Sequence, residues 1–163
     1  MKSNQTEQRV ALFAGSFDPF TKGHEAIVEA ALRLFDEVVV GIGSNVAKSA
    51  LLDVEQRKRL IDDLYSGEER VSSAIYGTLT VDFAREIGAT ALIRGVRGVA
   101  DLEAERTLES VNRGLAPELQ TVLLLTPAEV AHISSSCVRE LLAFGKEVDM
   151  MMPRGIELKN YML

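Results

Sequence analysis

Five short runs of apolar and β-branched residues lie at intervals along the chain, and none of them shows a helical period. Continuous apolar runs of this length are typical of strands that are covered on both faces of a parallel sheet. We therefore expect buried strands at residues 10–14, 38–42, 71–76, 90–93 and 121–125.

Between these runs, apolar residues recur every three or four positions, as they do on one face of a helix. The repeats are Ile27, Ala30, Ala31 and Leu34; Leu60, Ile61 and Leu64; and Val81, Ala84 and Ile87. Residues that start or stop helices stand beside them. The start signals are Thr21, the capping box of Asp53 and Gln56, Thr80 and Asp101; residues 137–144 form a last helical run; and the stop signals are Gly88 and Gly145.

Strand and helix alternate about five times, and this order predicts the fold class. We expect one doubly wound α/β domain over residues 1–163, with a five-stranded parallel sheet and helices on both faces. Residues 1–8 are expected to be a flexible N-terminal extension. Ligands of such sheets bind beyond the carboxyl ends of the strands, so the residues after each strand are the candidates for a site.

Composition narrows the classes of function. The chain has 18 Lys and Arg against 24 Asp and Glu, a net charge of −6, which argues against coating nucleic acid or an anionic membrane. The single cysteine, Cys137, excludes an intrachain disulfide and a zinc ligand set, and a reducing cytoplasm is the expected location. No segment reaches the roughly 18 apolar residues that span a bilayer, so neither export nor insertion is expected.

The segment after the first predicted strand carries the densest candidate chemistry. Gly15 allows close approach of a phosphate to the backbone, and Ser16 adds a hydroxyl donor. With Thr21 as N-cap, His24 falls in the first turn of the next helix, whose N-terminus favours anions. The alternative is a tight turn with a surface histidine, but the ten-residue string as a whole favours a phosphate site.

Basic residues follow two further strands. Lys48 ends a loop of small residues and can reach a phosphate, although most lysines are simply solvated. Arg94 and Arg97 stand three residues apart near glycines, where an anion between them would offset their repulsion. The alternative is that each arginine pairs with a nearby acid, such as Asp101, Glu103 or Glu105.

Three serines precede the last helical run. One of them suffices as an N-cap, so Ser134, Ser135 and Ser136 together offer surplus hydroxyls at a positive helix end. Arg139 in the first turn either hints at a bound anion or is solvated. Cys137 lies next to the serine run, and we assign it no catalytic part.

These segments together resemble the HxGH-type nucleotidylyltransferase superfamily and, within it, the phosphopantetheine adenylyltransferase family of bacterial coenzyme A biosynthesis. Other branches usually carry a histidine where this chain has Thr21. The resemblance covers residues 9–152 and is carried by residues 15–24, by residues 93–101 with Glu105, by Asn112-Arg113 and Pro117-Glu118-Leu119, and by residues 133–136.

The resemblance implies a Rossmann-like fold and transfer of AMP from ATP to 4′-phosphopantetheine, which gives dephospho-coenzyme A and pyrophosphate. It implies catalysis by His24, Lys48 and Arg94, with His24 stabilising charge at the α-phosphate. The implied contacts of 4′-phosphopantetheine are Ser16, Lys48, Thr80 and Arg94. The implied contacts of ATP are Ser16, Phe17, His24, Gly95, Val96, Arg97, Glu105, Val130, Ile133, Ser134, Ser135 and Ser136. Ser16, Thr80 and Val130 depart from the residues that are frequent in the family.

Partners follow from the same resemblance. We expect Mg²⁺ to accompany ATP, held mainly by phosphate oxygens and water rather than by a dedicated carboxylate set. The family is typically homohexameric, and coenzyme A is a candidate feedback inhibitor. Two alternatives stay open: transfer to another phosphate acceptor, such as nicotinamide mononucleotide or a sugar phosphate, and a nucleotide-binding module without turnover.

Overall fold

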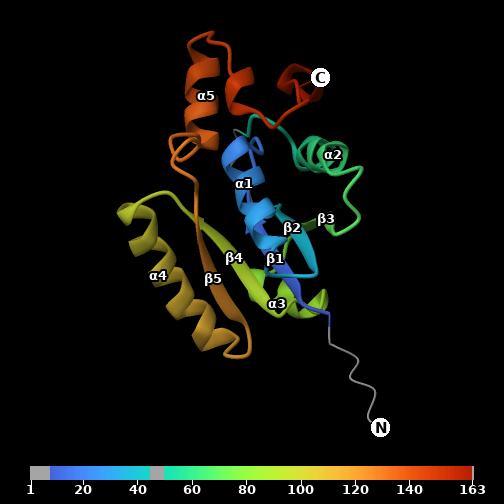
Figure 1. Ribbon diagram of the computed structural model, residues 1–163, viewed down its shortest axis with the longest axis vertical. Coiled ribbons are helices and arrows are strands. Elements are labelled where there is room, and N and C mark those ends of the chain that lie inside the picture. Colours follow the sequence, from blue (N-terminus) through green and yellow to red (C-terminus); the bar gives the residue numbers. More distant parts are fainter. Residues whose placement is uncertain (1–7, 45–49, 163) are drawn as a thin grey trace.

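The computed structural model describes residues 8–44 and 50–162, and its centre is one parallel sheet of five strands (Figure 1). The strand order is β3-β2-β1-β4-β5, so the chain builds outward from β1 in one direction and then in the other. This confirms the predicted fold class. The strands are β1 (Val10–Gly15), β2 (Glu37–Gly43), β3 (Val71–Tyr76), β4 (Ala91–Val96) and β5 (Gln120–Leu125).

Helices cover the sheet on both faces, as the pattern predicts. Alternate residues of β1 point to opposite faces: Ala11 and Phe13 join one buried cluster, and Leu12 and Ala14 join the other. The first cluster includes residues of α1 (Lys22–Ala31), α2 (Val54–Leu64) and α5 (Ser135–Ala143); the second includes α3 (Thr80–Glu86). Two 3₁₀ turns, Asp149–Met151 and Leu158–Tyr161, close the chain.

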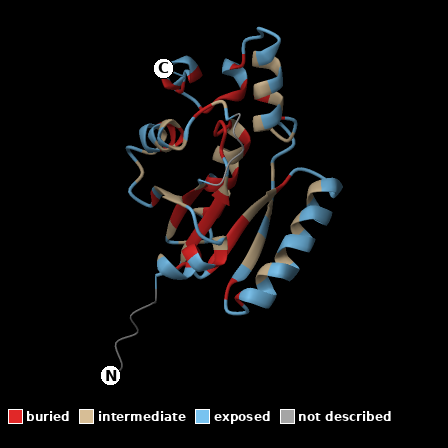
Figure 2. Ribbon diagram, turned by 180° about the vertical axis from the view of Figure 1, so that it is seen from behind, coloured by how far each residue is buried: buried red, intermediate tan, exposed pale blue. Residues whose placement is uncertain are grey.

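The remaining helix, α4 (Val99–Leu115), packs differently from the others. It lies beside β5 at one edge of the molecule, and Figure 2 shows it almost wholly in the exposed colour, whereas the central strands β1 and β2 are largely buried. None of its 17 residues, all within the described range, is buried. The helix therefore has no face buried in the core, and it contacts the rest of the chain through single side chains such as those of Asp101 and Glu105.

Several predicted boundaries are wrong. Helix α1 ends at Ala31, so Leu34 lies beyond it, and α5 starts at Ser135 rather than at Cys137. Strand β4 continues to Val96 instead of ending at residue 93, so Arg94 lies inside the strand. Leu79, not Thr80, precedes α3, because the Thr80 hydroxyl bonds the hydroxyl of Tyr76 instead of a backbone N–H group. Helix α4 starts at Val99, ahead of Asp101, whose carboxylate accepts the backbone N–H of Arg97.

The predicted N-caps of three helices are confirmed. Thr21 is the N-cap of α1. Asp53 and Gln56 form a reciprocal capping box at α2, with both side chain to backbone distances at 2.8 Å. Ser134 caps α5 by accepting the backbone N–H of Cys137 at 3.1 Å. Over residues 8–44 and 50–162, the structure contains no helix with the length and apolar character needed to cross a membrane.

Candidate active site

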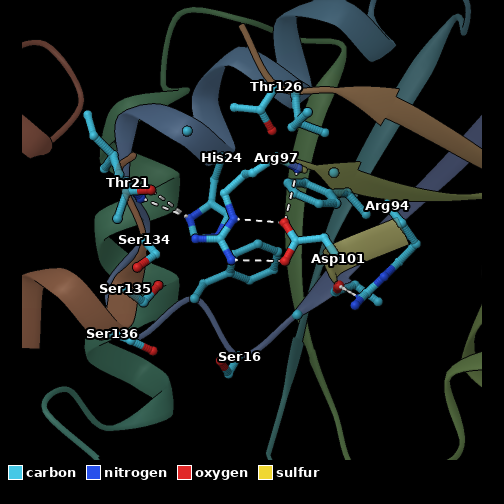
Figure 3. Close-up of a pocket in the computed structure, with 18 of the residues that line it drawn as sticks. Ser16, Thr21, His24, Arg94, Arg97, Asp101, Thr126, Ser134, Ser135 and Ser136 are labelled. Atoms are coloured by element: carbon cyan, nitrogen blue, oxygen red, sulfur yellow. Dashed lines mark hydrogen bonds and ion pairs between the residues drawn. The ribbon is translucent and has the colours of Figure 1, made fainter. Parts of the chain in front are cut away.

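A cavity of about 330 Å³ lies at the carboxyl ends of β1 and β4 and at the N-termini of α1 and α5. This is where the strand order reverses, the usual ligand site of a doubly wound sheet. Figure 3 shows the polar side chains of this cavity gathered around His24. The predicted residues that line it are Ser16, Phe17, His24, Arg94, Gly95, Arg97, Glu105, Ile133, Ser134, Ser135 and Ser136.

His24 is held in one tautomer by its own helix. The backbone N–H of Thr21 donates to Nδ1 of His24 at 3.0 Å, because His24 is the third residue of α1 and reaches back to the N-cap. An Nδ1 that accepts leaves the proton of a neutral imidazole on Nε2. His24 therefore offers an N–H donor on the side of the ring away from Thr21.

Aromatic rings fix the plane of His24. The rings of Phe17 and Phe20 lie 5.1 and 5.2 Å from the imidazole, centroid to centroid, and Phe17 meets it edge-on. Phe17 is itself buried and adopts a left-handed backbone conformation, with φ of 49°. Packing therefore keeps the imidazole from turning away from the cavity.

The same surroundings keep His24 neutral. Burial of the ring is the main cause that lowers the pKa of His24 from 6.5 to about 4, and the positive charges of Arg97 and Arg94 lower it further. The unfolded chain binds a proton at His24 between about pH 6.5 and pH 4 that the folded chain does not. Titration of His24 therefore does not lower the free energy of unfolding above pH 6.5, but lowers it progressively as the pH falls from 6.5 to about 4.

Arg94 and Arg97 each pair with an acid of α4. Arg94 donates from Nε and Nη2 to both carboxylate oxygens of Glu105 at 2.7 Å, and from Nη1 to the carbonyl of Ala14 at 2.7 Å. Arg97 donates from Nε to Asp101 at 2.9 Å, and this bond lowers the pKa of that carboxyl. The structure shows the acid pairing that the spacing left as an alternative.

The pairing does not remove the two arginines from the cavity. All four side chains line it, and Figure 3 shows the bonded pair of Arg97 and Asp101 beside His24. Guanidinium groups held by carboxylates are already placed for another planar or tetrahedral oxyanion. An incoming phosphate can therefore share or take over the bonds that Asp101 and Glu105 hold.

The hydroxyls of the serine run are largely engaged. Ser134 caps α5, Ser135 donates to the carbonyl of Pro19 at 2.8 Å, and Ser136 accepts a bond from Arg139 at 3.2 Å. Ser134 and Ser136 act as acceptors in these bonds, so their part in holding an anion stays a prediction. The N-terminus of α5 adds N–H groups that have no acceptor within the helix and favour an anion.

A second cavity, of about 310 Å³, adjoins the first. Gly15 and Ser16 line both cavities, so the turn after β1 is their shared wall. Thr80, a predicted contact, lies here with Tyr76, whose hydroxyl is 3.0 Å from that of Thr80 and whose ring stacks on Phe83. The other lining residues are Gly43, Ser44, Thr78 and Leu79.

Some predicted residues are not brought to either cavity. Val96 and Val130, both in the described ranges, line neither of them, and Lys48 lies outside the described residues. Sequence reasoning missed Thr126, which follows β5 as the predicted site residues follow other strands, and that position could have pointed to it. Tyr76 was also missed as a site residue, although it ends a predicted strand.

Comparison with known proteins places these features in a family. The cytidylyltransferase-like family model matches residues 12–141. A phosphopantetheine adenylyltransferase of Porphyromonas gingivalis is 47% identical over 152 residues, covering 93% of this chain and 99% of that protein. The enzyme of the same name from Bacteroides fragilis is 43% identical over 150 residues, 92% of this chain and 99% of that protein.

Comparison with solved structures supports the fold. A solved structure from Francisella tularensis, a bifunctional NMN adenylyltransferase/ADP ribose pyrophosphatase, superposes with a TM-score of 0.72 over 95% of this chain and 48% of that one. The two sequences are 18% identical, so the likeness concerns the fold alone.

Proposed function

Because the chain belongs to the phosphopantetheine adenylyltransferase family, within the cytidylyltransferase-like family, we propose that its two adjoining cavities hold the two substrates of that reaction. The activity is transfer of the adenylyl group of ATP to 4′-phosphopantetheine, which gives dephospho-coenzyme A and pyrophosphate in coenzyme A biosynthesis. The single observation that carries the proposal is the turn at Gly15 and Ser16, which lines both cavities beside His24.

The larger cavity suits the triphosphate of ATP. The N-termini of α1 and α5 both open onto it, and each such end carries about +0.5 of an elementary charge. Arg97 forms an ion pair with Asp101 there, and its guanidinium can bond a phosphate that displaces the carboxylate. In a chain of net charge −6, two helix N-termini at one cavity favour binding of a polyanion there rather than elsewhere on the surface.

The smaller cavity suits the pantetheine arm. Its wall combines the apolar side chain of Leu79 with the hydroxyls of Tyr76 and Thr80, a mixture that matches a chain of methylene and amide groups. Arg94 reaches the carbonyl of Ala14, next to the shared turn, and supports binding of the acceptor phosphate at that point. Lys48 remains part of this proposal on the family motif alone.

The chemistry then needs positioning and charge rather than a covalent nucleophile. An oxygen of the acceptor phosphate attacks the α-phosphorus of ATP in line, a new P–O bond forms, and the bond to pyrophosphate breaks. His24 donates from Nε2 to an α-phosphate oxygen as negative charge builds there, and its neutral form at pH 7 keeps that proton in place.

Mg²⁺ enters as part of the ATP substrate. The carboxylates nearest the cavity, Asp101 and Glu105, are each bonded to an arginine. Within residues 8–44 and 50–162, no group of three potential metal-binding side chains occurs. Phosphate oxygens and water would therefore supply most of the ligands of the ion.

The choice of acceptor is tested by swapping it. In a coupled assay of pyrophosphate release with Mg²⁺ and ATP, we expect turnover with 4′-phosphopantetheine and none with nicotinamide mononucleotide or glycerol phosphate. Chelation of Mg²⁺ should stop the reaction. Turnover with another acceptor, or ATP binding without release of pyrophosphate, would contradict the proposal.

The exposed apolar side chains of α4 support the proposed homohexamer. Val99, Val111 and Leu115 are 76%, 55% and 49% exposed, and Leu125 of the neighbouring β5 is 80% exposed. A helix with no buried residue and several apolar ones suits burial against further copies of the chain. Sedimentation equilibrium should give six chains per particle, and a monomer at micromolar concentration would contradict this.

A further inference from the structure

A buried ion pair lies beneath the shared turn. The side chain of Arg57 on α2 is 2% exposed and that of Asp18 is 5% exposed, and Nε of Arg57 lies 3.7 Å from Oδ1 of Asp18. Their neighbours Leu52 and Phe20 are buried apolar residues. A charge in such surroundings is stable only when it is paired and hydrogen-bonded, so each partner fixes the other.

Both side chains of the pair form hydrogen bonds with backbone groups, which belong to the turn after β1 and to the segment before α2. Arg57 donates from Nη1 to the carbonyl of Ser16 at 3.1 Å and from Nε to the carbonyl of Leu52 at 2.8 Å. The carboxylate of Asp18 accepts the N–H groups of Leu51 and Leu52 at 2.9 and 2.8 Å. The turn after β1 is thereby tied to the segment that leads into α2.

The same turn is held from its other side by α5. Arg139 donates from Nη1 to the carbonyl of Asp18 at 2.6 Å, and Ser135 donates to the carbonyl of Pro19 at 2.8 Å. Between these anchors, Phe17 has a positive φ that a residue with a side chain rarely adopts. The turn therefore takes its shape from the groups that hold it, and Arg57 is the group that holds Ser16.

We propose that Arg57 is a positioning residue for adenylyl transfer, which acts through Asp18 and the Ser16 carbonyl to fix the wall between the two substrates. This rests on the proposed function, because that wall matters only if both cavities are filled. Arg57 touches neither cavity, but a displacement of the turn by about 1 Å can lower a rate by about 100-fold. A lysine keeps the charge of Arg57 and loses the fork that reaches two carbonyls.

The first test is Arg57→Lys, with Arg59→Lys as its matched control. Arg59 lies on the same helix and donates to the carbonyl of Asn160 at 2.8 Å, away from both cavities. We expect Arg57→Lys to lower kcat by about 10- to 100-fold per folded molecule while the Kd of ATP changes by less than about threefold. Arg59→Lys should leave kcat and both KM values unchanged. The turnover of the unmodified chain in the same assay tests the proposed function separately.

A second comparison separates positioning from a loss of folded protein. If Arg57 and Asp18 hold the turn as one unit, Asp18→Asn should behave like Arg57→Lys, and Arg57→Lys should lower kcat much less in an Asp18→Asn background than alone. The proposal is overturned if kcat per folded molecule stays at the native value or if the two losses simply add. It is also overturned if neither Arg57→Lys nor Asp18→Asn reaches a native circular dichroism spectrum at 10 °C, since the pair would then serve folding alone.

Discussion

His24→Ala is expected to lower kcat for adenylyl transfer by about 100- to 1000-fold, because the group that donates to the α-phosphate oxygen is lost. The Kd of ATP should change little, since the helix N-termini and Arg97 remain. The loss should appear equally in kcat and kcat/KM, the mark of an interaction made in the transition state.

His132→Ala is the matched control for this variant. His132 is the second of two histidines in the chain, and it is exposed and lines neither cavity. Its replacement should leave turnover at the native value. Steady-state pyrophosphate release and calorimetric ATP binding on the same samples supply both measurements, and native turnover in His24→Ala would remove His24 from the mechanism.

Arg94→Ala should have the second largest effect. The change removes a charge proposed to hold the acceptor phosphate and leaves the carboxylate of Glu105 unpaired beside it, where it repels that phosphate. We expect kcat/KM for 4′-phosphopantetheine to fall by about 100-fold or more, with a smaller change in the Kd of ATP.

Two further variants complete this test. Arg94→Ala combined with Glu105→Ala should recover part of the lost kcat/KM, because the repelling carboxylate is gone. Arg33→Ala, at an exposed position just after α1, should behave like the native chain. Equal loss in the single and double variants would contradict the proposed role of Glu105, and an unchanged kcat/KM in Arg94→Ala would contradict that of Arg94.

The sequence predicts the fold well because buried parallel strands and amphipathic helices leave periodic signals within short windows. The predicted ends of helices and strands are wrong where tertiary contacts override the local sequence signals. Thr80 does not cap α3, since Tyr76 lies within reach of its hydroxyl. The strand holding Arg94 continues to Val96 because β5 pairs with it over its whole length, which no local pattern reports.

In the candidate site, too, local motifs predict some features and tertiary contacts decide the others. Contiguous motifs place His24, Ser16 and the serine run correctly around one cavity. The partners of their side chains come from distant elements and could not be predicted: Ser135 bonds Pro19, 116 residues away, and Arg57 bonds Ser16, 41 residues away. The carboxylate of Asp18, in the same string as His24, anchors the segment before α2, a contact that no local pattern reports.

The presence of a proton on Nε2 decides whether His24 can donate to the α-phosphate, and it can be measured directly. In ¹⁵N-histidine-labelled protein without ligand, the His132→Ala variant identifies the signals of His24. At pH 7 we expect a neutral imidazole with its proton on Nε2 and none on Nδ1, and a titration only toward about pH 4. A neutral ring with its proton on Nδ1 would leave Nε2 without a proton and would contradict the mechanism, and an imidazolium at pH 7 would contradict the bond from the Thr21 N–H to Nδ1.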